Sequence, residues 1–374
     1  MAPRDRKKRR RRSSAVVLLN GVLTLLVIAI VAAGAAGFYG LSQFYKAGTN
    51  AAETPFLVEK GSGVGTIATR LEEQGLIDSA LLFRGAFQLS RKDAKILPGQ
   101  YVIPAHASMA DVLALITETK PQEFFLNVVP GETSWQVAAR VNDPAQNLSG
   151  EDVTPPPEGT LLAVRHDFFP GDTRQSVIDD MQKKMAAAVA DVWAKRDTSI
   201  DDVITSPQQL VTMASLVEKE TGIASERPDV AAVFINRLRK HMRLQTDPSV
   251  IYGITLGHNK LDRALTTKDL NTKTPYNTYQ VDGLPAGPIA NPGLDALEAV
   301  AHPSKTENLY FVAKSGNPAD GHLFSATYAQ HRKNVALYRQ AVKNEAADEA
   351  EQAKDALEAE QAKDGGDTTG DSAQ

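Results

Sequence analysis

The hydrophobic and polar positions of the chain follow three successive patterns. Residues 15–39 form a run of 25 residues without a charged side chain. After a small, polar stretch over residues 40–53, apolar positions recur in short strand-like runs and at helical spacing. From residue 343 onward the chain is rich in Ala, Glu and Lys, and the sequence EQAKD occurs twice. The three patterns predict a membrane helix, a folded α+β region and an acidic, disordered tail over residues 343–374.

The charge-free run predicts a single transmembrane helix over residues 15–39. At about 1.5 Å per residue it can cross a hydrocarbon core of about 30 Å with some tilt. A cleavable signal peptide is the rival interpretation, but its apolar region is usually only about 7–15 residues long. Residues 1–14 carry eight Arg or Lys and one Asp. The positive-inside rule therefore predicts a cytoplasmic basic arm at 1–14, a linker at 40–53 and an extracytoplasmic remainder.

Two folded modules are predicted after the linker. Residues 54–120 read as a small α+β module, with strand-like segments at 56–58 and 101–103 and a last helix at 108–119. Residues 124–342 read as a larger α+β domain that opens with a strand. The predicted fold class is therefore α+β, with one N-terminal transmembrane helix.

Composition and charge exclude several classes of function. The chain has no Cys, which excludes disulfide scaffolds, thiolate metal sites and cysteine nucleophiles. The net charge is −4, and the part between the basic arm and the acidic tail is nearly neutral, which argues against a nucleic-acid-binding protein. No two of the seven His have the i, i+4 spacing of a helical zinc site. No metal and no other cofactor is predicted.

A helix that begins after Ser206 carries the candidate chemistry. Ser206, a following Pro and Gln209 have the pattern of a capping box. The buried face of this helix is predicted to consist of Leu210, Met213, Ala214, Leu216 and Val217. Glu218 and Glu220 flank that face, and Glu220 lies over its apolar residues. Partial desolvation raises the pKa of such a carboxyl and lets it hold a proton near neutrality. The helical wheel alone also allows a simpler interpretation, in which Glu218 and Glu220 are ordinary surface residues at a helix end.

Three segments rich in Gly, Pro, Tyr and Asn follow this helix, at residues 244–249, 276–279 and 283–293. Ordering loops of this composition costs conformational entropy, so such loops are typical of a functional site. Tyr and Asn suit a carbohydrate site, where aromatic faces meet sugar rings and amides bind hydroxyl and acetamido groups. The same residues also make ordinary turns.

Seven motifs follow one another in this part of the chain: MASLVEKET at 213–221, FINRL at 234–238, RLQTDP at 243–248, YNTY at 276–279, GLPAGPIANPG at 283–293, AHP at 301–303 and LYFV at 309–312. Taken in this order, they closely resemble the endolytic murein transglycosylase family, the YceG-like proteins. The resemblance covers about residues 54–338 and is very specific from residue 206 onward. It is weak over the small module. Because the family's small module is LysM-like, residues 54–120 are expected to be a LysM-like module that contacts or positions glycan.

The resemblance implies cleavage within nascent peptidoglycan strands at the MurNAc–GlcNAc β-1,4 bond, which leaves a 1,6-anhydro-MurNAc end and would terminate strand elongation. It implies a protein of the bacterial inner membrane with its catalytic domain outside the cytoplasm. The family's catalytic acid is the second Glu of its Glu-Lys-Glu-Thr motif, which matches Glu220. One carboxyl suffices, because the 6-hydroxyl of the sugar replaces an activated water. The substrate-binding candidates are Glu218, Gln245, Asp247, Tyr276, Asn277 and Tyr279.

One departure and two alternatives remain open. Residues 158–166 read EGTLLAVRH where the family usually has a Pro-Asp-Thr-Tyr-like segment after Glu-Gly-x-Leu, so no substrate contact is assigned there. A water-using muramidase could pair Glu220 with Asp247 or Glu218. A non-catalytic scaffold could instead bind the cell wall and recruit cell-wall synthesis proteins through its anchor or tail.

Overall fold

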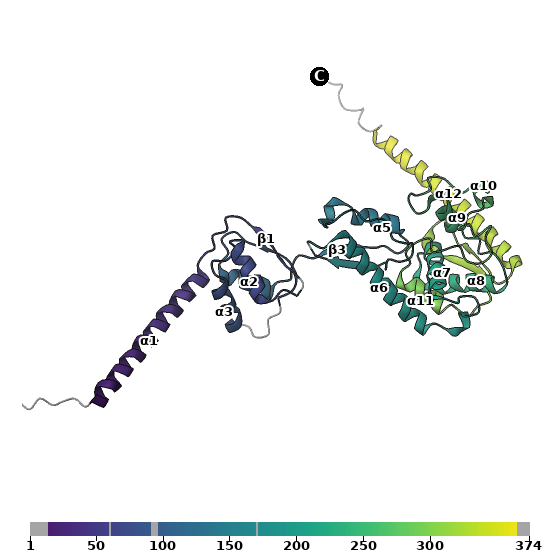
Figure 1. The fold of residues 1–374 in the computed structure, drawn as a ribbon. Helices are drawn as coiled ribbons and strands as arrows, with labels where there is room; N and C mark the ends of the chain where they lie inside the picture. The colour runs from purple at the N-terminus through teal and green to yellow at the C-terminus, as the bar shows by residue number, and fades with distance from the viewer. Residues whose placement is uncertain (1–13, 60, 91–95, 170, 365–374) are drawn as a thin grey trace, which may run out of the picture. The chain divides into compact units, whose positions relative to one another are not determined.

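The computed structural model describes residues 14–59, 61–90, 96–169 and 171–364 (Figure 1). The chain forms two compact units, Met1–Phe124 and Phe125–Gln374. The domain boundaries inferred from the sequence stay predictions. Both units combine helices and strands, which agrees with the predicted α+β class.

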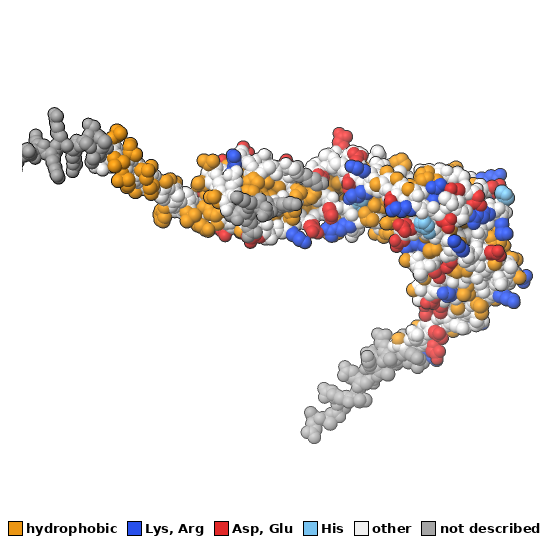
Figure 2. Space-filling view, turned by 90° about the horizontal axis from the view of Figure 1, so that it is seen from below, with side chains coloured by type: hydrophobic (Ala, Val, Ile, Leu, Met, Phe, Trp, Pro, Cys, Tyr) orange, Lys and Arg blue, Asp and Glu red, His pale blue; other side chains and the backbone are white. Residues whose placement is uncertain are grey.

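The first unit begins with the apolar helix α1 (Ser14–Tyr45). Among the described residues it is the helix that is long and apolar enough to cross a bilayer, over Leu18–Tyr45. Hydrophobic side chains cover it in the view of Figure 2. The helix runs six residues into the predicted linker, because residues 40–45 carry no charge and no Pro and pack against the small module. The predicted cytoplasmic arm lies outside the described residues, apart from Ser14.

The small module has a strand–helix–helix–strand–helix order. Its elements are β1 (Thr54–Val58), α2 (Val64–Glu73), α3 (Ala80–Ser90), β2 (Gly99–Ile103) and α4 (Met109–Glu118). The two strands pair antiparallel, with Thr54 opposite Ile103. Ser108 caps α4 in a complete capping box with Asp111. The core of the module includes Phe56, Ile67, Leu71, Phe83 and Ile116. The LysM-like assignment stays a prediction.

The second unit is organised around α7 (Pro207–Glu220). Four helices contact it: α6 (Arg174–Lys195), α8 (Arg227–Arg239), α9 (Asp247–Thr255) and α11 (Leu294–Ala301). The predicted buried face is confirmed, since all five of its residues are fully buried. Val211, Thr212 and Ser215 are buried as well. An amphipathic wheel underestimates the burial of α7 because neighbours surround this helix on several sides.

Shorter elements complete the second unit. They are β3 (Phe124–Asn127), α5 (Ser134–Val141), β4 (Arg165–Phe168), α10 (Thr267–Asn271), β5 (Tyr310–Ala313) and β6 (His322–Ser325). Strand β3 pairs with β4, and β5 pairs antiparallel with β6. The segment that departs from the family pattern ends in β4. There His166 is buried, with Nε2 2.8 Å from the carbonyl oxygen of Leu162, so this side chain belongs to the interior.

The prediction of a disordered tail over residues 343–374 is wrong for its first part. Helix α12 runs from Tyr328 to Asp364. Ala, Glu and Lys are strong helix formers, and a helix already formed at Tyr328 needs no new nucleation to continue. Glu345 still contacts the folded unit, because its Oε2 accepts a hydrogen bond of 2.8 Å from the backbone N–H of Gly316. Residues 365–374 lie outside the described residues.

Truncation after residue 347 should leave both the melting temperature and strand cleavage unchanged. Truncation after residue 343 also removes Glu345, and should change the free energy of unfolding by no more than about 0.5 kcal/mol, because the lost hydrogen bond is exposed. Thermal unfolding of the two shortened proteins beside the full chain measures the effect. A large fall in melting temperature for the 347 truncation would show that the far end of α12 packs on the folded unit.

Candidate active site

The catalytic candidate Glu220 is the last residue of α7. Ser206 caps the start of the helix, and its Oγ accepts a hydrogen bond from the backbone N–H of Gln209 at 3.3 Å. The predicted capping box is only half formed, because the side chain of Gln209 accepts from the N–H of Thr205 at 2.7 Å instead of from Ser206. At the other end the backbone becomes extended at Thr221. The end of this buried helix therefore fixes the position of Glu220.

Glu220 is only partly exposed, and its carboxyl is held by a neighbouring loop. The hydroxyl of Thr246 donates a hydrogen bond to Oε1 of Glu220. Loss of hydration on burial raises the pKa of Glu220, against the lowering effect of the Thr246 hydrogen bond. The negative charge of Asp247 raises this pKa further, whereas His322 and Arg237 lower it. The net shift is upward, which is the direction that a general acid needs.

Arg237 of α8 fixes the loop that carries Thr246. Its guanidinium donates to the carbonyl of Leu244 at 2.5 Å and to that of Leu309 at 2.7 Å. Gln245, which follows Leu244 in the chain, has a φ of +49°. This left-handed backbone conformation is strained for a residue other than Gly. The side chain of Gln245 is exposed, beside the buried Thr246.

Buried hydroxyls join this loop to the segment at residues 276–279. The backbone N–H of Thr246 donates to Oγ1 of Thr278 at 3.0 Å. Ser249 lies between them, with its Oγ 2.8 Å from Oγ1 of Thr278 and 2.7 Å from the carbonyl oxygen of Thr246. All three residues are buried. These hydrogen bonds therefore hold the two motifs together next to Glu220.

Asp247 and Tyr279, which belong to the same two segments, form a hydrogen-bonded pair. The hydroxyl of Tyr279 donates a hydrogen bond of 2.6 Å to Oδ1 of Asp247. Burial raises the pKa of Tyr279, and the bond to Asp247 raises it further, so the phenol stays neutral and remains a donor. Asp247 is exposed, and its charge acts on Glu220.

Glu218 points to a different set of partners. Its Oε1 accepts from Nη2 of Arg227 at 2.9 Å, and its Oε2 accepts from the backbone N–H of Gly293 at 2.9 Å. Only 4% of the Glu218 side chain is exposed. This carboxylate therefore ties α7 to α8 and to the segment at residues 283–293, the glycine-rich loop.

The motifs around these residues match a known family. The YceG-like family matches residues 56–337, three quarters of the chain. This chain belongs to the YceG-like family. It is 30% identical over 309 residues to the endolytic murein transglycosylase of Bacillus subtilis (strain 168), covering 75% of this chain and 83% of that protein. It is 29% identical over 323 residues to the endolytic murein transglycosylase of Streptococcus pneumoniae serotype 2, covering 75% of this chain and 57% of that protein.

A yceG-like protein of known structure, from Listeria monocytogenes, also matches the chain. It is 29% identical to this YceG-like chain, and the match covers 75% of this chain and 98% of that one with a TM-score of 0.47.

The RLQTDP, YNTY and GLPAGPIANPG motifs lie at the end of α7, although not every predicted substrate contact is available there. Asn277 is fully buried, and its amide donates to the carbonyls of Asp269, Leu270 and Thr272. The expectation that Asn277 binds substrate directly is therefore corrected, because its amide is used to hold the loop. Tyr276 is partly buried, with its ring 4.8 Å from that of Tyr252.

Several residues of this YceG-like site were not predicted from the sequence. Thr246 stood inside the RLQTDP motif, but nothing in its local pattern indicated a bond to Glu220. Glu226 links the end of α7 to the β5–β6 hairpin, because its Oε2 accepts from the hydroxyl of Thr221 at 3.4 Å and lies 2.8 Å from Nδ1 of His322. Within the described ranges, no group of three or more His, Asp or Glu is placed to hold a metal ion.

Two substitutions should move the pH dependence of cleavage in opposite directions. Glu220 must be protonated to act as the acid, so the alkaline limb of kcat/KM reports its pKa in the free enzyme. Asp247→Asn removes a negative charge that raises the pKa of Glu220, so this limb should move to lower pH. Thr246→Val removes the hydrogen bond that lowers the pKa, so the limb should move to higher pH. If the alkaline limb moved in the same direction in both variants, the assignment of Glu220 as the acid would be contradicted.

Proposed function

We propose that this YceG-like chain is a membrane-anchored lytic transglycosylase, a lyase that acts on peptidoglycan. It would cleave the MurNAc–GlcNAc β-1,4 bond within nascent strands and leave 1,6-anhydro-MurNAc ends. The observation that supports this most directly is the partly buried Glu220, with its raised pKa and its bond to Thr246, in a chain whose relatives are named endolytic murein transglycosylases.

The proposed reaction uses Glu220 twice. Its protonated carboxyl donates the proton to the leaving glycosidic oxygen as the bond to the anomeric carbon breaks. The hydroxyl of Thr246 stabilises the carboxylate that results. That carboxylate then accepts the proton of the sugar's own 6-hydroxyl, as this oxygen bonds to the anomeric carbon. Glu220 ends protonated, and no water is consumed.

The residues next to Glu220 have proposed roles in the same reaction. The negative charge of Asp247 would stabilise the positive charge that develops on the sugar ring in an oxocarbenium-like transition state. Tyr279 would hold that carboxylate in place through its hydrogen bond. The exposed side chain of Gln245 and the ring of Tyr276 would contact the glycan. Glu218 would position the glycine-rich loop through its hydrogen bond to the backbone N–H of Gly293.

A water-using muramidase is the competing enzymatic proposal. It needs a second carboxylate to activate water or to act as a nucleophile. Glu218 is poorly suited, because both of its carboxylate oxygens are hydrogen-bonded within the protein. Asp247 is the candidate that remains, and one of its oxygens accepts the hydroxyl of Tyr279. The single-carboxyl mechanism therefore needs fewer additional assumptions.

The proposed location follows from α1 and the residues before it. The apolar helix would cross the bacterial inner membrane once. The basic residues before it would keep the N-terminus in the cytoplasm, so both folded units would lie outside. There the glycan strands are the substrate, and cell-wall synthesis proteins are candidate partners.

Product analysis tests the chemistry. Purified glycan strands are incubated with the full chain in water enriched in heavy oxygen, and the products are analysed by mass spectrometry. The proposal predicts 1,6-anhydro ends that contain no heavy oxygen. Reducing ends that carry heavy oxygen would establish a hydrolase instead. Strand binding without any cleavage would favour the scaffold.

A further inference from the structure

Helix α1 stays apolar for longer than a bilayer requires. No charged residue occurs from 13 to 45, a length of about 50 Å at 1.5 Å per residue. The hydrocarbon core is about 30 Å thick and is crossed by about 20 residues, so a span that starts at Ala15 leaves the core near residue 34. Phe38 and Tyr39, which are 78% and 65% exposed, then lie in the outer interface, where aromatic side chains concentrate. The last turns of α1 emerge from the core while they are still apolar.

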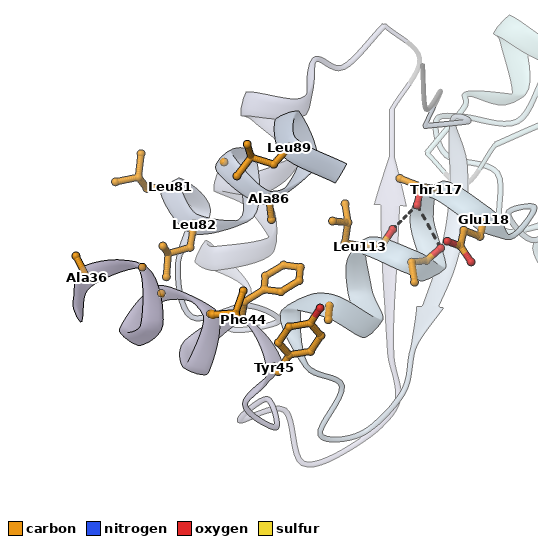
Figure 3. A pocket seen from close by; sticks show the side chains of 16 residues that line it. Ala36, Phe44, Tyr45, Leu81, Leu82, Ala86, Leu89, Leu113, Thr117 and Glu118 are labelled. Atoms are coloured by element: carbon orange, nitrogen blue, oxygen red, sulfur yellow. Dashed lines mark hydrogen bonds between the residues drawn. The ribbon is translucent and has the colours of Figure 1, made fainter. Parts of the chain in front are cut away.

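These last turns of α1 form one wall of an apolar groove of about 660 Å³. Helix α3 forms the opposite wall and α4 contributes Leu113 (Figure 3). Small residues keep the groove open, because a Cβ added at Gly37 or at Gly85 would meet no atom within 4 Å. Figure 3 shows Ala36 and Leu81 at one end of the groove, with Glu118 at the other.

The outer face of α3 continues this apolar surface. Leu81 is 76% exposed and Leu89 is 91% exposed, and with Gly85 they stand at i, i+4 and i+8 on one side of the helix. Leucines exposed to this degree on one helix face, next to an open apolar groove, indicate a surface that is covered in the working protein. The surface adjoins the turns of α1 that leave the bilayer, so the nearest apolar material is the outer leaflet.

We propose that α3 lies in the outer interface of the membrane and that acyl chains of membrane lipids fill the groove between α1 and α3. This inference rests on the proposed membrane anchoring by α1. It makes the small module a second membrane contact, which restricts its rotation about the anchor. Acyl chains are the chosen occupant because the groove is continuous with the membrane-spanning helix. Glu118, its acidic residue, lies at the end away from Ala36.

Tryptophan fluorescence in nanodiscs tests the proposal. The two native tryptophans are replaced in the full chain by Trp135→Phe and Trp193→Phe. Single tryptophans are then introduced by Leu81→Trp or Leu89→Trp. These positions are exposed, so the substitutions leave the fold intact. Each protein is placed in nanodiscs, one chain per disc, with lipids brominated on their acyl chains, which quench tryptophan on contact. Both tryptophans should lose emission.

Two further tryptophans in the same background separate the possible failures. Ile28→Trp lies in the anchor and should be quenched. Val102→Trp, at an exposed position of β2 outside the groove, should keep its emission. An unquenched Ile28→Trp would overturn the anchor itself. Quenching at Ile28 without quenching at Leu81 and Leu89 would overturn the lipid-filled groove and leave the anchor standing. Protection of Leu81 and Leu89 only in discs that hold two chains would assign the groove to a second copy, and would also overturn the proposal.

Discussion

Replacing Glu220 by Gln should reduce strand cleavage by about 10²–10⁴-fold or more, the factor that general acid catalysis contributes. The amide keeps the size of the side chain and can still accept the hydrogen bond from Thr246, but it cannot deliver a proton. Glycan binding should survive. Cleavage is measured on purified strands by the rate at which new ends appear, and binding is measured by co-sedimentation with the same strands.

The same substitution has an independent signature in stability. The raised pKa of Glu220 means that the folded state favours the protonated carboxyl. Its contribution to stability is therefore fully present below the pKa of the unfolded chain and is lost as the pH rises through the folded pKa. Glu220→Gln removes this dependence. The variant should lose less stability than the native chain across that pH window, which also demonstrates that an inactive variant is folded.

The second large effect is expected at Glu218, and it concerns stability instead of chemistry. Glu218 and Arg227 form an ion pair whose side chains are 4% and 11% exposed. Removing one partner of a buried pair costs about 3–5 kcal/mol when the other charge is left uncompensated. Here Oδ2 of Asp295 still lies 3.5 Å from Nη1 of Arg227, but Asp295 is 75% exposed, so it compensates the buried charge only in part. Glu218→Gln should therefore lower the free energy of unfolding substantially. Denaturant unfolding of the purified variant measures the loss.

A double variant distinguishes the ion pair from a general packing defect. Glu218→Gln with Arg227→Gln has no uncompensated charge, so it should recover part of the stability that Glu218→Gln loses. The single variant Glu218→Gln should still cleave strands at temperatures where it is folded. If Glu218→Gln is folded and inactive while Glu220→Gln still cuts, the roles of the two glutamates are the reverse of those proposed.

The candidate site was predictable to the extent that its residues stand in ordered motifs. Glu220 was singled out by its place over an apolar helix face and by the second Glu of the family motif. Local sequence could not separate Glu218 from it, because both flank the same face of α7. The separation comes from α8 and from the glycine-rich loop, which supply Arg227 and the N–H of Gly293 to Glu218 alone. Thr246 becomes a partner of Glu220 by the same kind of long-range contact.

The sequence by itself determined the features that depend on local pattern. These are the apolar helix α1, the α+β modules, the helix that carries Glu218 and Glu220 and the membership of its motifs in one family. Hydrophobic periodicity and capping residues act over a few neighbouring positions, so they can be read without a fold. The helical course of residues 343–364 was not among these predictions, although the helix propensity of Ala, Glu and Lys favours it once the preceding helix is formed.

Only the tertiary structure decided what each polar side chain does. Asn277 and Tyr279 are two residues apart in one motif, yet the first is fully buried and the second donates to the exposed Asp247. The direction of the pKa shift at Glu220 likewise depends on burial and on residues distant in sequence, Thr246 and Asp247. Desolvation and hydrogen bonding depend on which segments pack together, and that arrangement is set by the whole core around α7 rather than by the pattern of any one segment.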